Sequence, residues 1–197
     1  MNHTTTPDSR AKRLKARTEA THDALDKTVM AAQPFASRQN YLRFAQMQHR
    51  FHRDIAALFD DAALIALIPD LPGRQRLADI TQDLADLGAA PRDPDAAPAL
   101  AADVDLPTAL GWLYVAEGSN LGAAFLRKFA AKLGLSDDFG ARHLAGAPEG
   151  RARHWQSFIA ALDAVDLTPA QEDAVTAVAD AAFARVHALA QDMLAQG

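Results

Sequence analysis

One histidine near the amino terminus has the neighbours that a metal ligand needs. His22 precedes Asp26 by four residues, so on a helix the carboxylate could accept a hydrogen bond from the ring nitrogen that does not bind the metal. Lys15 comes two turns earlier on nearly the same face, about 10 Å away by helical rise, where its ammonium would suit a carboxylate at the rim of a large cofactor. A helical histidine is more often an ordinary core or surface residue, so these three positions alone leave both interpretations open.

A second unusual segment contains two glycines four residues apart, Glu117-Gly118-Ser119-Asn120-Leu121-Gly122, with Gly111 upstream in the same predicted helix. Each glycine inside a helix costs about 1 kcal/mol relative to alanine, yet this chain has 45 alanines. The glycines therefore indicate a surface that excludes even a methyl group. One explanation is close packing against another helix. The other is a flat ligand that the helix backbone approaches, with Ser119 and Asn120 holding water.

Polar residues near position 50 form a third set of candidates. Gln48 and His52 are one turn apart and share a helical face, while His49 and His52 are spaced as a weak metal pair. An ordinary solvated polar face explains the same pattern, so the spacing alone does not assign a function.

Two other enzyme classes find little support. Glu19, three residues before His22, is similar to half of a di-iron carboxylate site, but that site needs a second such pair and two further glutamates. None of the other three glutamates in the chain has a histidine at this spacing. The Gly-x-Ser-x-Gly signature of many serine hydrolases is absent, and Ser119 lies inside an expected helix.

The composition restricts partners and ligands further. Twenty Lys and Arg against 25 Asp and Glu give a net charge of -5 and a pI near 5.7, which argues against nucleic acid and anionic lipid as partners. Without cysteine, any bound metal must use His, Asp or Glu. No apolar run reaches the roughly 18 residues of a membrane helix, and the amino terminus is polar, so we expect a soluble cytoplasmic protein.

The elements that must position these residues are predicted to be helices. Forty-five alanines against twelve Val and Ile residues favour helix over strand, and 197 residues suit one domain. We expect an all-α, single-domain irregular bundle of about six to eight helices over residues 10–197, after a disordered start at 1–9. The predicted helices span about 10–31, 38–59, 74–87, 108–134 and 149–163, a long loop covers 88–107, and a last helix begins at 168–171.

Helix ends and core positions follow from the same patterns. Asp8 or Ser9 is expected to cap the first helix, Ser37 the second, and Thr168 the last, where Gln171 completes a capping box. Apolar residues at helical spacing predict the buried faces of the second helix and of the helix over 108–134, which should not lie exposed: Tyr41, Phe44, Phe51, Ile55, Leu58, Leu110, Leu113, Leu121, Phe125 and Leu133.

Several segments together resemble the bacterial haem oxygenases, and the likeness covers nearly the whole chain from about residue 10. They are Thr18-Glu19-Ala20-Thr21-His22, Pro34-Phe35-Ala36-Ser37-Arg38 and Leu113-Tyr114-Val115-Ala116-Glu117-Gly118-Ser119-Asn120-Leu121-Gly122. Two later runs, Phe139-Gly140-Ala141-Arg142-His143-Leu144 and Trp155-Gln156-Ser157-Phe158, extend the likeness toward members that serve haem-iron acquisition.

This resemblance implies a role for each candidate. His22 would be the proximal ligand of haem iron, with Asp26 its hydrogen-bonding partner, and the distal helix would cross the other haem face at Gly118 and Gly122. Substitution of His22 should abolish turnover. Substitutions at four other histidines should affect turnover much less: His3, His143, His154 and His187. The distal polar positions that would supply protons through water are Gln48, His52, Ser119, Asn120 and, from the third helix, Arg76.

The reaction that the resemblance implies turns haem b, both cofactor and substrate, into biliverdin, carbon monoxide and ferrous iron. It needs dioxygen and an external reductant, such as a ferredoxin or a flavoprotein reductase. Lys15 and Tyr114 would anchor the haem propionates, which places the α-meso carbon beneath the distal helix and predicts biliverdin IXα. In family members that cleave the haem ring at the β or δ position, other polar or basic residues hold the propionates. The position of one such lysine is occupied here by the apolar Phe129. Two alternatives stay open: a non-degrading haem carrier or sensor on the same fold, and an iron-free small-molecule enzyme of the broader fold.

Overall fold

The computed structural model describes residues 9–68, 70–92 and 95–194, and these form helices without a β-strand. This confirms the predicted all-α fold class. The predicted disordered start at 1–9 lies outside the described residues except for Ser9. The α-helices are α1 (Arg10–Arg17), α2 (Glu19–Ala31), α3 (Arg38–Asp54), α4 (Ala62–Leu67), α5 (Leu77–Asp86), α6 (Leu106–Lys132), α7 (Arg151–Ala164) and α8 (Pro169–Leu194).

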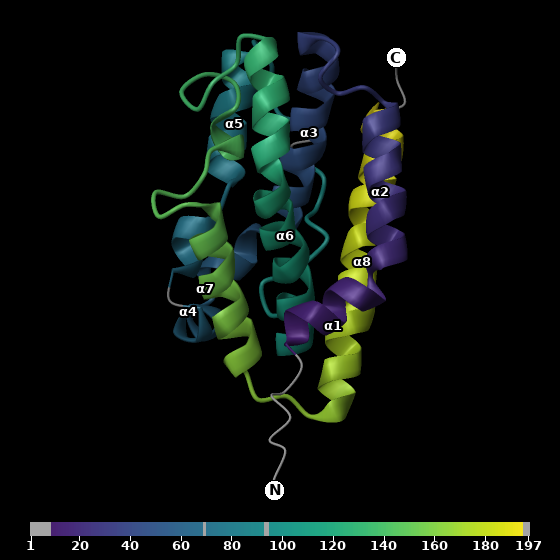
Figure 1. Cartoon of the computed structure of the whole chain (residues 1–197), viewed down its shortest axis with the longest axis vertical. Coiled ribbons are helices and arrows are strands. Elements are labelled where there is room, and N and C mark those ends of the chain that lie inside the picture. Colours follow the sequence, from purple (N-terminus) through teal and green to yellow (C-terminus); the bar gives the residue numbers. More distant parts are fainter. Residues whose placement is uncertain (1–8, 69, 93–94, 195–197) are drawn as a thin grey trace, which may run out of the picture.

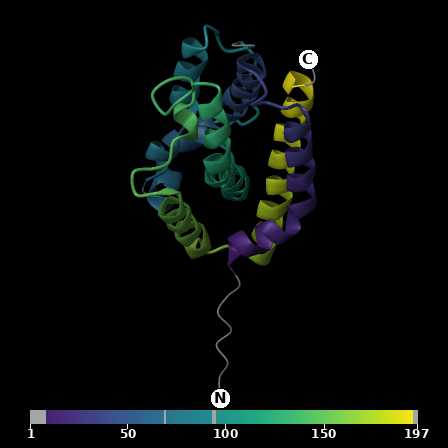
Figure 2. The ribbon, with the colours of Figure 1, turned by 45° about the horizontal axis from the view of Figure 1, so that its top comes forward.

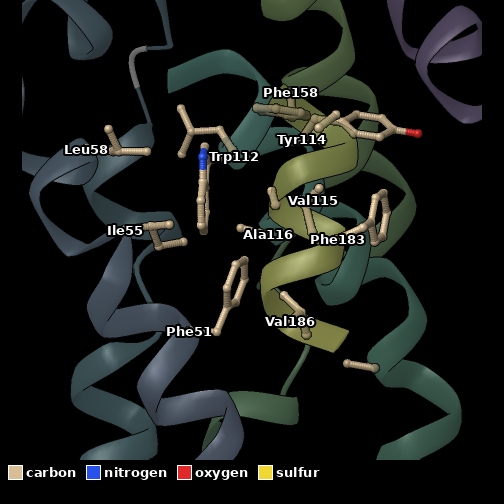
Figure 3. Close-up of a cluster of buried hydrophobic side chains, with 14 of the residues drawn as sticks. Phe51, Ile55, Leu58, Trp112, Tyr114, Val115, Ala116, Phe158, Phe183 and Val186 are labelled. Atoms are coloured by element: carbon tan, nitrogen blue, oxygen red, sulfur yellow. The ribbon is translucent and has the colours of Figure 1, made fainter. Parts of the chain in front are cut away.

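The bundle is organised around α6 and α8. Figure 1 shows α6 in the middle of the molecule, with α7 on one side and α2 on the other. The helix α8 packs against α6, α3 and α2, and both views show α2 and α8 side by side (Figures 1 and 2). Figure 3 shows the apolar cluster where α3, α6 and α8 meet, in which Phe51 stacks on Trp112 with ring centroids 6.0 Å apart. The five core residues predicted for the second helix are all buried.

Gly111 lies where α6 meets α8 at close range. A Cβ atom added here would lie 2.8 Å from Val178 Cγ1 and 3.0 Å from backbone atoms of Val175 and Ala179. Only a residue without a side chain allows the two backbones to approach this closely. For this glycine, the close-packing explanation is therefore correct.

The predicted helix over 10–31 is divided at Thr18, so that prediction was wrong. The Thr18 hydroxyl donates to the carbonyl of Leu14 at 2.9 Å, and its φ of -99° and ψ of 7° leave the α-helical range. A threonine that bonds back to its own helix in this way commonly bends it. Because α1 and α2 point in different directions (Figure 1), Lys15 does not share a straight helical face with His22.

Other helix boundaries differ by small amounts. The predicted second helix is α3 followed by a 3-10 helix over Ala56–Asp60, and the predicted third helix is the 3-10 helix Leu71–Arg74 followed by α5. The sequence did not predict α4, because six apolar residues are too few to establish a period. The ends of α6 and α7 lie within two residues of the predictions.

Helix capping follows the predictions at two of three positions. The Ser37 hydroxyl accepts from the Asn40 backbone, and Thr168 and Gln171 form the expected reciprocal capping box. Ser9 is the N-cap residue of α1 but makes no capping hydrogen bond through its side chain, and Asp8 lies outside the described residues. None of the described helices is both long and apolar enough to cross a membrane.

The carboxyl-terminal half of α6 is more exposed than predicted. Leu110 and Leu113 are buried, but Leu121 and Phe125 are 40% and 70% exposed. An apolar pattern identifies side chains that avoid water, but it does not tell whether their neighbour is protein or a bound ligand. This exposed half of α6 is the first indication of where a ligand lies.

Candidate functional site

The helix α2 has an unusual environment because none of its residues is buried. Two side-chain hydrogen bonds connect it to α8. One joins Thr21 Oγ1 to Asp180 Oδ1, and the other joins Thr28 Oγ1 to His187 Nε2, each at 2.8 Å. The helix is therefore fixed from one side and leaves its other faces open to a ligand.

His22 stands on this helix with 53% of its side chain exposed. Its Nδ1 atom lies 3.6 Å from Oδ2 of Asp26, and its ring meets Phe183 edge to face at 5.5 Å between centroids. These contacts turn Nδ1 toward the carboxylate and leave Nε2 available for a metal. The structure thus brings His22 and Asp26 together as the sequence predicted.

Gly118 and Gly122 have surroundings unlike those of Gly111. A Cβ atom at either position would have no described atom within 4 Å outside its own helix backbone and chain neighbours. Contact with another described helix therefore does not explain these two glycines. The same half of α6 exposes three large apolar side chains at four-residue spacing, Leu121, Phe125 and Phe129. Together these features form an apolar surface that lets a flat molecule reach the helix backbone.

The helices α2 and α6 run in the same direction (Figure 1). Residues just before and just after α2 contact side chains of α6. Near the start of α2, the Tyr114 hydroxyl lies close enough to the Thr18 side chain for Thr18 to lower the pKa of Tyr114. After its end, the Phe35 ring lies 5.7 Å from the Phe129 ring between centroids. Between these two connections, α2 packs on α8.

These connections set the register of the two helices. His22 is four residues beyond Thr18, and Gly118 is four residues beyond Tyr114, so each lies about 6 Å of helical rise past the same junction. His22 and Gly118 therefore stand at similar heights on two neighbouring parallel helices. A planar ligand between them would meet an imidazole on one side and bare backbone on the other.

Lys15 and Tyr114 lie at the same end of this region. Lys15 is exposed on α1, three residues before Thr18. Tyr114 is 7% exposed, and burial raises the pKa of its hydroxyl although the Thr18 side chain opposes this shift. The structure places a cation and a phenol near the α1–α2 junction, although not along one straight helix.

The polar residues of α3 are less accessible than the sequence suggested. Gln48 is half-buried, and His52 is 3% exposed with no hydrogen-bond partner for Nδ1 among the described residues. Burial lowers the pKa of His52 to about 3, with smaller contributions from His143, Arg76 and His49. The His52 imidazole is therefore neutral near pH 7 and can donate or accept a hydrogen bond without carrying charge.

Three further predicted site residues differ in what they contact. Arg76 is the residue before α5 rather than a member of it, and its Nε atom is buried without a described partner. The Ser119 hydroxyl donates to the Ala116 carbonyl of its own helix at 2.8 Å, while Asn120 Nδ2 donates to Glu117 Oε1 at 3.4 Å. Asn120 and Arg76 both line a small cavity beside α6, but Ser119 does not.

Sequence reasoning missed a buried polar cluster beside α6. Arg74 is fully buried and donates to Glu117 Oε2 at 2.5 Å and to Asp70 Oδ2 at 2.7 Å. Elsewhere, His143 Nδ1 lies 2.7 Å from Oδ2 of the fully buried Asp83. These partners are distant in sequence, so no local spacing indicates them. The available signal was a glutamate inside an otherwise apolar stretch of α6.

One group of residues near this cluster has metal-ligand geometry. Asp70, Glu149 and His154 offer ligand atoms within 4.8 Å of one another. Arg74 already donates to Asp70, so a cation bound there would face a guanidinium. His22 remains the better candidate for a metal ligand.

The sequence comparisons identify one family. A family model described as Heme oxygenase matches residues 8–192. A curated relative, heme oxygenase PigA of Pseudomonas aeruginosa, is 44% identical over 176 residues, which cover 89% of this chain and 88% of that protein.

Solved structures give the same result. The NO- and CO-bound heme oxygenase of Neisseria meningitidis superimposes with a TM-score of 0.89 at 43% identity, covering 96% of this chain and 94% of that one. Heme oxygenase of Leptospira interrogans superimposes with a TM-score of 0.76 at 16% identity, covering 94% of this chain and 100% of that one. At that lower identity, the likeness concerns the fold alone.

Proposed function

Because the chain belongs to the haem oxygenase family, we propose that it binds haem b between α2 and α6 and degrades it to biliverdin, carbon monoxide and ferrous iron. Dioxygen and an external reductant are the other reactants. The observation that carries this placement is the register of His22 on α2 with Gly118 on α6, in a region where the two helices leave their facing surfaces free.

The residues of this region suit haem. His22 would present Nε2 to the iron, and Asp26 Oδ2, 3.6 Å from Nδ1, is placed to accept a hydrogen bond from Nδ1 when the imidazole binds the metal. Gly118 and Gly122 admit the ring to the helix backbone, and the exposed side chain of Phe125 supplies apolar contact. Bound haem supplies iron that activates dioxygen next to the ring to be cut, and an imidazole ligand lacks the strong electron donation of a thiolate.

Orientation of the ring within its plane is assigned to Lys15 and Tyr114. Charge-assisted bonds to propionates are the strongest directional contacts that an otherwise apolar disc can make. Lys15 and Tyr114 lie near the α1–α2 junction, at one end of the region. Propionates held there place the α-meso carbon deeper between the helices, so the proposed product is biliverdin IXα. Phe129, at the opposite end, offers no competing anchor.

Proton supply is assigned to the polar groups near the distal helix. His52 remains neutral and has an unpartnered Nδ1 atom, and Arg76 has an unpartnered Nε atom. Asn120 and Gln48 complete this set, and Ser119 contributes a hydroxyl on the exposed side of α6. These groups can order water near the ring, so that no acidic side chain donates directly to the bound oxygen. Proton supply through water favours oxidation of the ring over early cleavage of the O–O bond.

The electron donor is assigned to the class of ferredoxins or flavoprotein reductases. A haem carrier or sensor that binds through His22 without cutting the ring is the second candidate. The 44% identity to a protein named as a heme oxygenase over most of both chains favours the enzyme.

One experiment separates these functions. Purified protein is mixed with hemin, and then a reductant is added in air while the absorption spectrum is followed. The enzyme converts the haem bands into biliverdin absorption. A carrier keeps its haem bands unchanged, and an iron-free enzyme of the same fold shows no bound haem, so either result would contradict the proposed function.

A further inference from the structure

A polar site lies between α6 and α7. Figure 1 shows α7 on one side of α6 and α2 on the other. The centre of this site is Glu117, which directly precedes Gly118 and has a side chain only 1% exposed. Arg74 Nη1 donates to one carboxylate oxygen at 2.5 Å, and Asn120 Nδ2 donates to the other at 3.4 Å. A buried carboxylate is thus fixed immediately beside the glycine segment.

His154 on α7 faces this carboxylate. Its Nδ1 atom lies 2.7 Å from Glu149 Oε1, and its Nε2 atom lies 3.8 Å from Glu117 Oε2. Nε2 is buried and has no hydrogen-bond partner among the described residues. Because ionised Glu149 can only accept a hydrogen bond, Nδ1 carries a hydrogen, and Nε2 is the nitrogen that faces Glu117.

A small cavity adjoins the two groups. It measures about 10 Å³ and is lined in part by Glu117, His154, Arg76 and Asn120. This is room for about one water molecule, and the walls offer the several polar partners that a buried water requires. One water there would connect Nε2 of His154 to Oε2 of Glu117.

The charged groups around this cluster all bear on where a proton sits. Arg74 donates to two carboxylates, Asp70 and Glu117, and the guanidinium groups of Arg76 and Arg151 line the same cavity. Burial raises the pKa of Glu117, and the charges of Arg74, His154 and Arg76 oppose this shift. A proton on Glu117 removes the cost of a buried carboxylate, and a proton on His154 places a cation 3.8 Å from it. The two groups are therefore suited to exchange one proton.

We propose that His154 and Glu117 hold one proton between them and form a proton store beside the glycine segment of α6, with Glu149 as the residue that positions the imidazole. The store extends the proposed haem reaction and rests on it for its use. In one state, Nε2 carries the proton and Glu117 is ionised. In the other, Oε2 carries it and the imidazole is neutral. When the reaction consumes the Glu117 proton, Nε2 replaces it, and water from solvent reprotonates Nε2.

The first test uses the protein without haem. Infrared spectroscopy of the wild-type protein at neutral pH is expected to show a carboxylic acid carbonyl band that shifts in D₂O and is lost in Glu117→Gln. In His154→Gln the proton has one remaining site, so the same band should become stronger and less sensitive to pH. The Asp173→Asn change, on the exposed face of α8, is the matched control and should leave the band unchanged.

The second test measures turnover with hemin, a chemical reductant and air. His154→Gln and Glu117→Gln should each lower the rate at least about tenfold and increase the solvent isotope effect, while hemin affinity stays close to wild type. For His154 this is a larger effect than its place in the sequence suggested. Glu149→Gln should shift the pH profile of the rate, because it removes the partner that stabilises the imidazolium. This surface change keeps the test decisive if the buried variants fold poorly.

The outcomes separate the store from the enzyme itself. If the wild-type protein binds but does not degrade hemin, the proposed function fails, and the infrared band still decides whether the shared proton exists. If the wild-type protein degrades hemin, and folded His154→Gln and Glu149→Gln proteins match its rate and pH profile, the store is wrong. A wild-type spectrum without the Glu117 carboxylic acid band also overturns it.

Discussion

The Nδ1 atom of His22 lies 3.6 Å from the Oδ2 atom of Asp26, one turn further along α2. Both side chains are more than half exposed, so this pair contributes little to folding. Its consequence is orientation, because Nδ1 faces the carboxylate and Nε2 is therefore directed away from it.

The Asp26→Ala change should therefore weaken haem binding without destabilising the protein. The loss of a hydrogen-bonding partner of a metal ligand typically lowers metal affinity about 10- to 100-fold. Hemin titration followed by absorption spectroscopy measures the affinity, and thermal unfolding measures stability. Asp23→Ala removes an equally exposed carboxylate from the same helix and is the control. Equal losses of hemin affinity in both variants would show that the loss comes from removing a negative charge and not from a change in the orientation of His22.

The three glycines of α6 should respond differently to larger side chains. At Gly111, alanine would meet Val178 and the α8 backbone at 2.8 to 3.0 Å, and such overpacking costs about 1–3 kcal/mol of unfolding free energy. At Gly118 and Gly122 a leucine meets no described neighbour and gains up to about 1 kcal/mol in helix propensity. The same leucine side chain should occupy the space next to the helix backbone and prevent haem from binding there.

Thermal unfolding and hemin titration on the three variants check this contrast. Gly111→Ala should have a lower melting temperature than the wild-type protein, and its folded molecules should bind hemin with wild-type affinity. Gly118→Leu and Gly122→Leu should remain as stable as the wild-type protein and lose hemin affinity and turnover. A folded Gly118→Leu protein with unchanged affinity and turnover would remove the flat-ligand explanation for this glycine.

The biliverdin isomer tests the anchoring of the propionates. Biliverdin IXα should be the main product of the unmodified protein. Lys15→Met should shift the isomer mixture, and more so when combined with Tyr114→Phe, because both directional contacts are then removed. Chromatography of the extracted products gives the isomer ratio. A predominantly β or δ product from the unmodified protein would show that other residues hold the propionates.

Acid should destabilise the protein partly through His52. The pKa of this imidazole is lowered to about 3 in the folded state, against 6.5 for an unperturbed histidine, chiefly because of burial. Between these values the unfolded chain binds a proton that the folded chain does not, so stability falls as the pH falls through this window. At pH 4.5 the effect is about 2–3 kcal/mol.

Replacing His52 with a group that does not titrate should remove this contribution. Urea unfolding at pH 7 and pH 4.5 is compared between the wild-type protein and His52→Gln. The variant should lose about 2–3 kcal/mol less between the two pH values. The same loss in both proteins would mean that His52 takes up its proton in the folded state as well.

Local patterns predicted much of the fold because they reflect local physics. Ser37 and the Thr168–Gln171 capping box start helices where expected, since capping depends on residues within one turn. The break at Thr18 was missed because a threonine is also compatible with a straight helix, and its back-bonded rotamer is not visible in the sequence.

The candidate site was predictable only in part, for the same reason. His22 and Asp26 are one turn apart, and Gly118 and Gly122 share one face of one helix, so sequence spacing brings each pair together. The contrast between Gly111 and Gly118 depends on α8, which lies elsewhere in the chain. The buried partners Arg74 and Glu117 are likewise brought together by tertiary packing alone.

The most direct test of the account is hemin binding by His22→Ala compared with the wild-type protein. Alanine costs nothing in helix propensity at this exposed position, so the variant should fold normally. It should lose the absorption spectrum of histidine-ligated haem and all biliverdin formation, and added imidazole should restore part of the spectrum. Wild-type haem spectra and biliverdin yield in His22→Ala would contradict the placement of haem between α2 and α6.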